Sequence, residues 1–314
     1  MSESTVVTVL GPIAPVDLGV TDAHDHLFLR SPALPGQEFD DPDRATEEVS
    51  AAKRGGLQAI VEVTPIGLGR HPAGMRAVAE ATGVHIVAAT GYHRDAHYPP
   101  GHWVREAPVE VLAERIITDL VQGMHPDDWL SDAPFDAARA GVIKAGASYQ
   151  HISPLEERRL MAAAWGHRET GAPILVHTEI GTCGHAIVDV LAREGVRSER
   201  VILAHMDRNP DLELHIELAE RGVTLEYDTV GRIKYRPDSQ LLDLIEGMVE
   251  AGQANRILLG LDLGQRDYFH AYGGGPGLTY LMETFVPRLR KRIGSSATDR
   301  ILVDNGAGAF ATSK

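Results

Sequence analysis

Cysteine is almost absent from this chain of 314 residues, and its scarcity excludes several kinds of protein. Cys183 is the only cysteine, so the chain can form neither an internal disulfide nor a metal cluster held by several thiolates. We expect Cys183 itself to be a small residue at a strand end or in a loop. Any metal chemistry must therefore depend on histidine, lysine and carboxylate side chains.

Long apolar runs and basic clusters are missing as well. No apolar stretch reaches the roughly 18 residues that a transmembrane helix needs, and the N-terminal residues lack the basic region of a signal peptide. Acidic residues outnumber basic ones by 44 to 30, which gives a net charge of −14. We therefore expect a cytoplasmic protein that binds neither membranes nor nucleic acid and acts on a small molecule.

Short apolar runs recur along the chain, and each is followed by a segment with helical spacing. Near-continuous apolar runs that are rich in β-branched residues are typical of parallel strands buried on both faces. The eight runs are Leu18–Ala23, Leu57–Val63, Val84–Ala89, Gly141–Lys144, Pro173–His177, Val201–His205, Val223–Tyr227 and Arg256–Asp262.

The segments between these runs predict amphipathic helices. The clearest are Pro108–Gln122, Pro154–Thr170, Asp211–Arg221 and Ser239–Ala251. Helix-start signals stand at Ser153-Pro154 and Asn209-Pro210, and glycines follow several segments.

Eight strand–helix alternations predict an α/β fold, a single (β/α)8 TIM barrel domain over residues 1–314. An open doubly wound sheet is the alternative, but no Gly-x-Gly-x-x-Gly turn follows the first run. Thr5–Pro15 predicts a short N-terminal β-hairpin with Gly11-Pro12 at its turn.

Candidate metal ligands stand where the predicted strands end. Side chains two apart in a strand point to the same side, so the imidazoles of His24 and His26 face one point. Four further candidates end later runs: Lys144, His177, His205 and Asp262. Barrel enzymes hold their chemistry at the carboxyl ends of the strands, and a buried charge there is costly unless it is paired or binds metal. The pattern predicts a metal site.

Three loops after predicted strands would contact the substrate, namely 91–107, 228–237 and 264–277. The second carries Lys234 and Arg236, and the third carries Arg266, so an anionic substrate is expected. The alternative is that these cations pair with neighbouring acids. Four aromatic or imidazole side chains of the first loop either line the entrance or pack within the loop, namely Tyr92, His93, Tyr98 and Trp103.

Together these residues resemble the phosphotriesterase family of the amidohydrolase superfamily, over nearly the whole chain. The matching pieces are Gly11-Pro12-Ile13, Asp17-Leu-Gly-Val-Thr, His24-x-His26, Val-Ile-Lys144-Ala-Gly, Val-His177-Thr, Ala-His205-Met-Asp, Gly-Leu-Asp262 and Thr284-Phe-Val-Pro-Arg-Leu-Arg. The chain departs from the family at Asp25, where many relatives have Glu, and at Asp304-Asn-Gly, where Asn-Pro is usual.

The resemblance implies a binuclear metal hydrolase. His24, His26 and Asp262 would bind the more buried ion, and His177 and His205 the more exposed one. Lys144 would be N6-carboxylated, and its carbamate would bridge two divalent ions, with zinc expected and manganese, cobalt or iron as alternatives. A bridging hydroxide would attack a carbonyl or phosphoryl centre, and Asp262 would accept or shuttle the proton.

The residues Arg-Ile-Lys234-Tyr, Gly-Leu-Asp-Leu-Gly-Gln-Arg266 and Ala271-Tyr-Gly-Gly resemble the branch that opens phosphorylated sugar lactones. There, Lys234 and Arg266 would hold the phosphate. Promiscuous phosphotriesterase activity would accompany this reaction. Alternatives are an aryldialkylphosphatase, an acyl-homoserine lactonase, an amide hydrolase, and a metal-binding barrel without turnover. Relatives are often dimers, so a homodimer is an alternative to a monomer.

Overall fold

The computed structural model describes residues 4–312, so the first three and last two residues of the predicted domain lie outside the description. Eight parallel strands follow one another around a sheet in sequence order, as the barrel prediction requires. They are β3 (Thr21–Asp25), β4 (Ala59–Glu62), β5 (His85–Gly91), β6 (Ala140–Ala147), β7 (Ile174–Thr178), β8 (Val201–Ala204), β9 (Thr224–Tyr227) and β10 (Ile257–Leu259).

The barrel closes where the end of β10 approaches β3. The amide of Asp262 donates a hydrogen bond to the carbonyl of His24 at 2.9 Å. Gly260 makes this approach feasible, since a Cβ at that position would lie 2.8 Å from the Cβ of His24. Two predicted metal ligands, His24 and Asp262, therefore come together at the closing seam.

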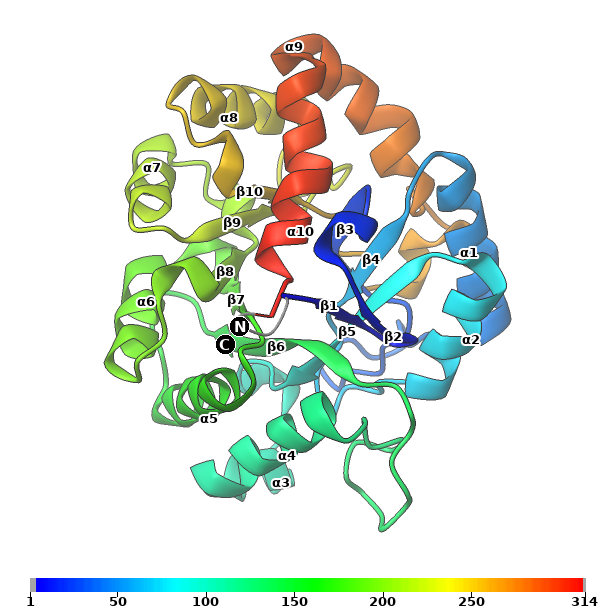
Figure 1. Ribbon diagram of the computed structural model, residues 1–314, viewed down its shortest axis with the longest axis vertical. Coiled ribbons are helices and arrows are strands. Elements are labelled where there is room, and N and C mark those ends of the chain that lie inside the picture. Colours follow the sequence, from blue (N-terminus) through cyan, green and yellow to red (C-terminus); the bar gives the residue numbers. More distant parts are fainter. Residues whose placement is uncertain (1–3, 313–314) are drawn as a thin grey trace.

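Helices surround the sheet, so that each strand is buried on both faces (Figure 1). Their bounds are α1 (Pro42–Arg54), α2 (Pro72–Thr82), α3 (Trp103–Glu106), α4 (Val109–Val121), α5 (Pro154–Thr170), α6 (Gly184–Arg193), α7 (Leu212–Glu220), α8 (Asp238–Glu250), α9 (Val286–Asp299) and α10 (Asn305–Ala309).

The local signals in the sequence predict some helix ends correctly and others incorrectly. Ser153 caps α5 with a capping box, in which the Glu156 amide donates to the Ser153 hydroxyl at 3.1 Å. Gly171 then ends α5 with a φ of 77°. The expected start at Asn209-Pro210 was wrong by one to two residues, because the Asp211 carboxylate accepts from the Leu214 amide and caps α7 instead.

An antiparallel hairpin, β1 (Val6–Thr8) and β2 (Gly11–Ile13), precedes the barrel as predicted, but its turn lies elsewhere. Gly11 and Pro12 belong to β2 and pair with Thr8 and Val7, and the turn is made by Val9 and Leu10. The side-chain hydroxyl of Thr8 donates to the Gly11 carbonyl and so stabilises this turn. The hairpin lies near both chain termini, at the barrel end seen in Figure 1.

Alternation along the strands decides which side chains enter the barrel. Val142 and Leu175 belong to the inner core of the barrel, whereas Ile143 and Val176 pack outward against the helices. Lys144 and His177 follow the inward parity of Val142 and Leu175. His205 would point outward after the inward Ala204, but its left-handed backbone, with a φ of 63°, departs from strand geometry at this position.

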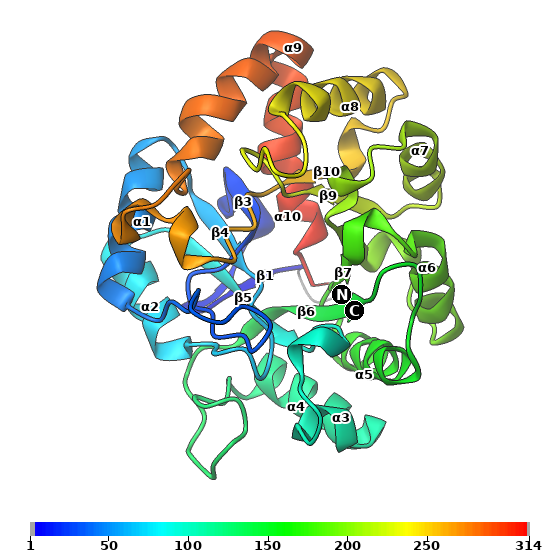
Figure 2. The same cartoon turned by 180° about the vertical axis from the view of Figure 1, so that it is seen from behind.

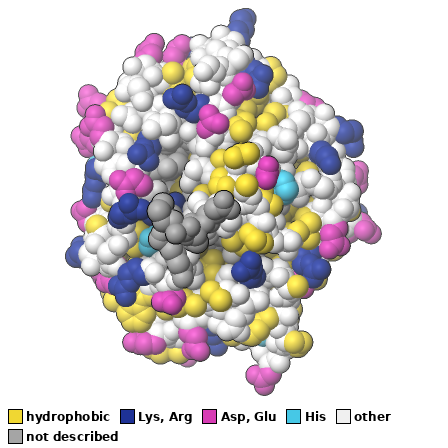
Figure 3. All heavy atoms as spheres, viewed as in Figure 1, with side chains coloured by type: hydrophobic (Ala, Val, Ile, Leu, Met, Phe, Trp, Pro, Cys, Tyr) yellow, Lys and Arg dark blue, Asp and Glu magenta, His cyan; other side chains and the backbone are white. Residues whose placement is uncertain are grey.

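The loops predicted to contact the substrate lie at the opposite end of the barrel, which faces the viewer in Figure 2. On the described part of the face shown in Figure 3, basic and acidic side chains are interspersed rather than separated into patches of one sign. Among residues 4–312, no helix combines the length and the apolar character that would let it span a bilayer.

Candidate metal centre

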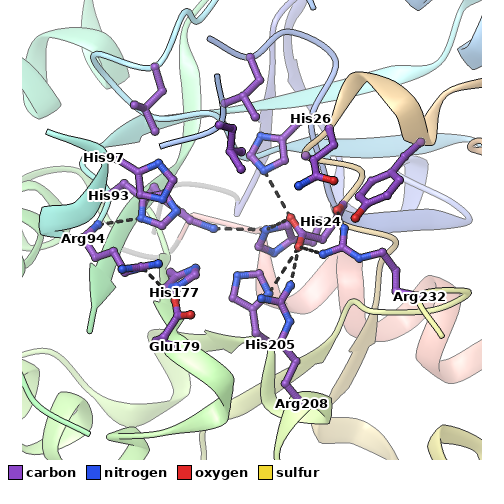
Figure 4. Close-up of a pocket in the computed structure, with 18 of the residues that line it drawn as sticks. His24, His26, His93, Arg94, His97, His177, Glu179, His205, Arg208 and Arg232 are labelled. Carbon is purple, nitrogen blue, oxygen red and sulfur yellow. Dashed lines mark hydrogen bonds and ion pairs between the residues drawn. The ribbon is translucent and has the colours of Figure 1, made fainter. Parts of the chain in front are cut away.

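The four predicted histidines converge at the carboxyl ends of the barrel strands (Figure 4). The ring of His205 lies 4.9 Å from that of His24 and 4.5 Å from that of His177, measured between centroids. His26 lies 6.0 Å from His24 on the other side. All four rings are at least nine-tenths buried. Three strand ends that are far apart in the sequence, those of β3, β7 and β8, thus supply one compact group of imidazoles.

Hydrogen bonds on the outer nitrogens fix how three of these rings face the centre. His24 Nδ1 lies 2.6 Å from Glu226, and His205 Nδ1 lies 2.7 Å from Asp228. His26 Nδ1 lies 2.7 Å from the hydroxyl of Thr64, which donates its own proton elsewhere. Each Nδ1 therefore carries the ring proton, and each Nε2 presents a lone pair inward, as a metal ligand must.

His177 has the opposite arrangement. Its Nε2 lies 2.8 Å from the carboxylate of Glu179, and Arg94 contacts the same oxygen at 2.8 Å. Its Nδ1 is buried and has no hydrogen-bond partner anywhere in residues 4–312. A buried, unpartnered imidazole nitrogen is unfavourable unless something binds it. This atom is the observation in the structure that fits a metal ion most directly.

Lys144 lies beside these rings, with its Nζ 3.4 Å from Nε2 of His24. Burial lowers the pKa of its amine to about 8, although the carboxylates of Glu226, Asp262 and Asp228 oppose that shift. A lowered pKa increases the fraction of neutral amine, which is the form that reacts with carbon dioxide. The environment thus fits a carbamate at this position.

Asp262 completes the group. Its Oδ1 lies 3.5 Å from Nε2 of His26 and 3.7 Å from Nε2 of His24, and its Oδ2 accepts from Arg208 and Arg232. Burial would raise the pKa of Asp262, but Arg232 and the neighbouring hydrogen bonds hold it well below its usual range. The carboxylate is therefore ionised and directs one oxygen at the two histidines.

Two sets of ligand atoms are close enough to hold an ion. One is His24, His26 and Asp262, which fits the inward nitrogens described above. The other is His24, His205 and Asp228, but the Asp228 oxygens already bind the Nδ1 and the amide of His205. Asp228 therefore supports the ligands from outside and is not expected to bind the ion itself.

A cavity of about 170 Å³ opens over these candidate ligands. The cavity also contains residues that the sequence analysis did not select as site residues. Among them are Arg94, His97, Glu179, Arg208, Arg232, Tyr235, Gln265 and Tyr268, and the cavity also contains His93, which was a candidate for the entrance. For Arg208 the available signal was its position, because it follows the strand-end His205 by three residues and so lies near the carboxyl end of a barrel strand.

The three predicted cationic contacts are not brought together. Lys234 lines the cavity and donates to the hydroxyl of Tyr268 at 2.6 Å. Arg266 is exposed and lies 5.6 Å from the ring of Tyr272, outside the cavity. Arg236 lies within 3.5 Å of Gln240 and of the Arg208 carbonyl, also outside it. The spacing of basic residues along the loops therefore did not predict which of their side chains face the cavity.

The two predicted tyrosines do not reach the cavity either. Tyr92 and Tyr98 are buried, and their hydroxyls donate to the carbonyls of Leu112 and Ile66. They are packing residues beneath the loop after β5. The cavity-facing positions of this loop are occupied by His93, Arg94 and His97, and the ring of His93 packs 4.5 Å from that of His177.

Fold and site together define a metal-dependent hydrolase barrel, and the comparisons specify the family. Residues 4–310 match the phosphotriesterase family. A phospho-furanose lactonase of Mycoplasmopsis agalactiae is 35% identical over 322 residues, covering 96% of this chain and 89% of that protein.

Solved structures of similar proteins support the same family assignment. A lactonase from Listeria monocytogenes superposes with a TM-score of 0.91 at 29% identity, covering 99% of this chain and 100% of the other. A phosphotriesterase homology protein from Escherichia coli, solved with phosphate in its active site, gives 0.85 at 30% identity, covering 94% and 99%. The chain belongs to the phosphotriesterase family and is a metal-dependent hydrolase of ester bonds.

Proposed function

We propose that this protein hydrolyses the lactone ring of an anionic, phosphorylated sugar at a centre of two divalent metal ions. The relatives named as lactonases, and the phosphate in the active site of the Escherichia coli protein, support this substrate class. Inorganic phosphate and a sugar phosphate share the same dianionic group. The cavity offers that group a matching environment.

The chain's own residues would hold the two ions. His24, His26 and Asp262 would bind one, and the inward nitrogens of His177 and His205 would bind the other. A carbamate on Lys144 would bridge them, which turns a repelled ammonium into an anionic ligand. When bound, such a pair lowers the pKa of a water molecule and polarises the carbonyl of the substrate.

The charge of the side chains that line the cavity is the observation that supports an anionic substrate most directly. Five basic side chains line the cavity (Arg94, Lys144, Arg208, Arg232 and Lys234) against two acidic ones, Glu179 and Asp262. Carboxylation of Lys144 would leave four cations against three anions, before any metal is counted. Such a cavity favours an anion and disfavours a neutral triester or an acyl chain.

Lys234 and Tyr268 are the residues best placed to bind a phosphate beyond the metal ligands. The Lys234 amine lies 5.4 Å from the centre of the Tyr268 ring and bonds to its hydroxyl. An ammonium and a phenol so arranged can each donate to one phosphate oxygen. In this proposal Tyr268, rather than Arg266, is the second residue that would bind the substrate phosphate.

Hydrolysis of five-carbon sugar lactones with and without a 5-phosphate tests this proposal. With zinc- or manganese-loaded protein, a pH indicator should report a preference of about a hundredfold for the phosphorylated lactone, equivalent to about 2.7 kcal/mol of transition-state binding. Lys234→Ala should abolish most of that preference, and Arg266→Ala should leave it unchanged.

Equal rates with and without phosphate would contradict the proposed substrate. An acyl-homoserine lactone and a nitrophenyl phosphotriester belong in the same assay, because faster turnover of either would assign the neutral-lactonase or phosphotriesterase activity instead.

A further inference from the structure

We propose that Arg208 and Arg232 form a guanidinium clamp that positions Asp262 for the metal ion at His24 and His26. The clamp is defined as these two side chains on the outer oxygen of one carboxylate. The inference rests on the metal-ligand role of Asp262 in the proposed function, and it assigns a task to two buried arginines that were not among the predicted ligands.

The clamp divides the two oxygens of Asp262 between two tasks. Arg208 donates to Oδ2 at 2.5 Å, and Arg232 donates to the same atom at 2.9 Å. Oδ1 is left facing the imidazoles of His24 and His26, 3.7 and 3.5 Å away. Figure 4 shows Arg208 and Arg232 reaching the same centre from adjacent loops. Both donors thus act on one oxygen and leave the other for an ion.

Arg232 also holds the backbone of Asp262, because its second guanidinium nitrogen donates to the Asp262 carbonyl. Asp262 has a φ of 48°, in the left-handed region that non-glycine residues seldom adopt. A donor that binds both the carbonyl and the carboxylate fixes this conformation. Arg232 therefore fixes the direction of the Asp262 side chain through both the backbone carbonyl and the carboxylate.

The arginines are themselves fixed in place. Each side chain is 6% exposed, and Tyr235 packs against both guanidinium groups, 4.5 Å from Arg208 and 5.4 Å from Arg232. Tyr268 covers Arg232 from another side at 5.0 Å. Rigid, stacked donors can orient a carboxylate in a way that a mobile surface cation cannot.

Two effects of the clamp on metal affinity have opposite signs. The positive charges of the clamp repel a cation, so the loss of these charges alone would raise the affinity for both ions. The hydrogen bonds of the clamp orient Asp262, so the loss of these bonds would lower the affinity only for the ion that Asp262 binds. We expect orientation to dominate, because removal of a partner of a metal ligand typically lowers affinity about tenfold to a hundredfold.

Zinc titration against a chromophoric chelator, with metal analysis of the dialysed protein, separates these effects. Arg208→Met and Arg232→Met should each weaken one of the two zinc equivalents by about tenfold or more and leave the other unchanged. Lys234→Met is the matched control, since it removes a cavity cation that does not touch Asp262, and it should weaken neither equivalent.

Arg208→Lys keeps the charge but not the planar fork of donors, so it should weaken the same zinc equivalent as Arg208→Met. Unchanged or strengthened zinc binding in folded Arg208→Met, Arg232→Met or Arg208→Lys protein would overturn the clamp. Wild-type protein that binds fewer than two equivalents would instead overturn the proposed metal centre, and the clamp with it.

Discussion

Nδ1 of His24 lies 2.6 Å from Oε2 of Glu226, so a candidate metal ligand at the end of the first barrel strand is held by a carboxylate from the seventh. Both side chains are buried, and across the closing seam only β10 lies between their two strands. The contact fixes the ring proton on Nδ1 and therefore presents Nε2 to the centre.

Removal of this carboxylate should weaken the binding of the ion that His24 would hold. We expect Glu226→Ala to lower the affinity of one zinc equivalent by about tenfold to a hundredfold, measured by competition with a chelator. Glu226→Gln retains an oxygen acceptor and should show a smaller loss. Identical zinc affinity in Glu226→Ala and wild type would mean that the barrel walls alone orient His24.

The proposed carbamate on Lys144 can be tested by spectroscopy. Wild-type protein reconstituted with zinc in ¹³C-bicarbonate should show a carbamate carbon signal by NMR, since burial lowers the pKa of the amine to about 8 and leaves reactive neutral amine near neutral pH. Lys144→Met protein should lack this signal and bind zinc poorly. A wild-type protein with two zinc ions and no carbamate signal would refute the modification.

Asp262→Asn should lose both metal and turnover. An asparagine has a single side-chain oxygen, and Arg208 and Arg232 would attract that oxygen and repel the amide group. The amide NH₂ would then face His24 and His26, where it cannot bind a cation. We expect one zinc equivalent to be lost and kcat to fall by at least about a hundredfold. Full zinc occupancy in this variant would contradict the assigned orientation of Asp262.

His215 should make stability depend on pH in the acidic range, away from the metal centre. Burial lowers its pKa to about 4 from an unfolded value near 6.5, and its Nδ1 lies 2.8 Å from the hydroxyl of Tyr227. Between these two pKa values the unfolded chain binds the extra proton, so the free energy of unfolding falls as the pH drops below about 6.5.

The size of this effect follows from the shift. From about pH 7 to about pH 5, His215 should cost about 2 kcal/mol of stability. Urea unfolding at both pH values measures it, and His215→Phe should show a loss smaller by about that amount. Equal pH dependence in the two proteins would mean that His215 already titrates normally in the folded state.

The barrel and its six candidate ligands were predictable because they depend on local patterns. Apolar runs mark buried parallel strands, and the residue that ends each run falls at one end of the barrel whatever the connecting loops do. Lys144 and His177 need only strand parity to point inward. His205 and Asp262 also needed left-handed backbones, which spacing alone does not show.

Loop contacts were less predictable, because loop side chains are placed by tertiary packing. Arg232, Lys234 and Arg236 alternate along one loop, yet the first two line the cavity and the third does not. Tyr92 and Tyr98 were expected either to line the entrance or to pack within the loop, and their buried rings show the second. Arg208 lies directly after a strand that was predicted correctly, but its partner Asp262 is 54 residues away.

The most direct test of the whole account is stepwise reconstitution of metal-free protein with zinc while hydrolysis of a phosphorylated sugar lactone is followed. The six ligands and the cationic cavity predict negligible turnover without metal and full turnover only after the second equivalent has bound. Full activity in metal-free protein, or after one equivalent, would contradict a catalytic centre of two metal ions.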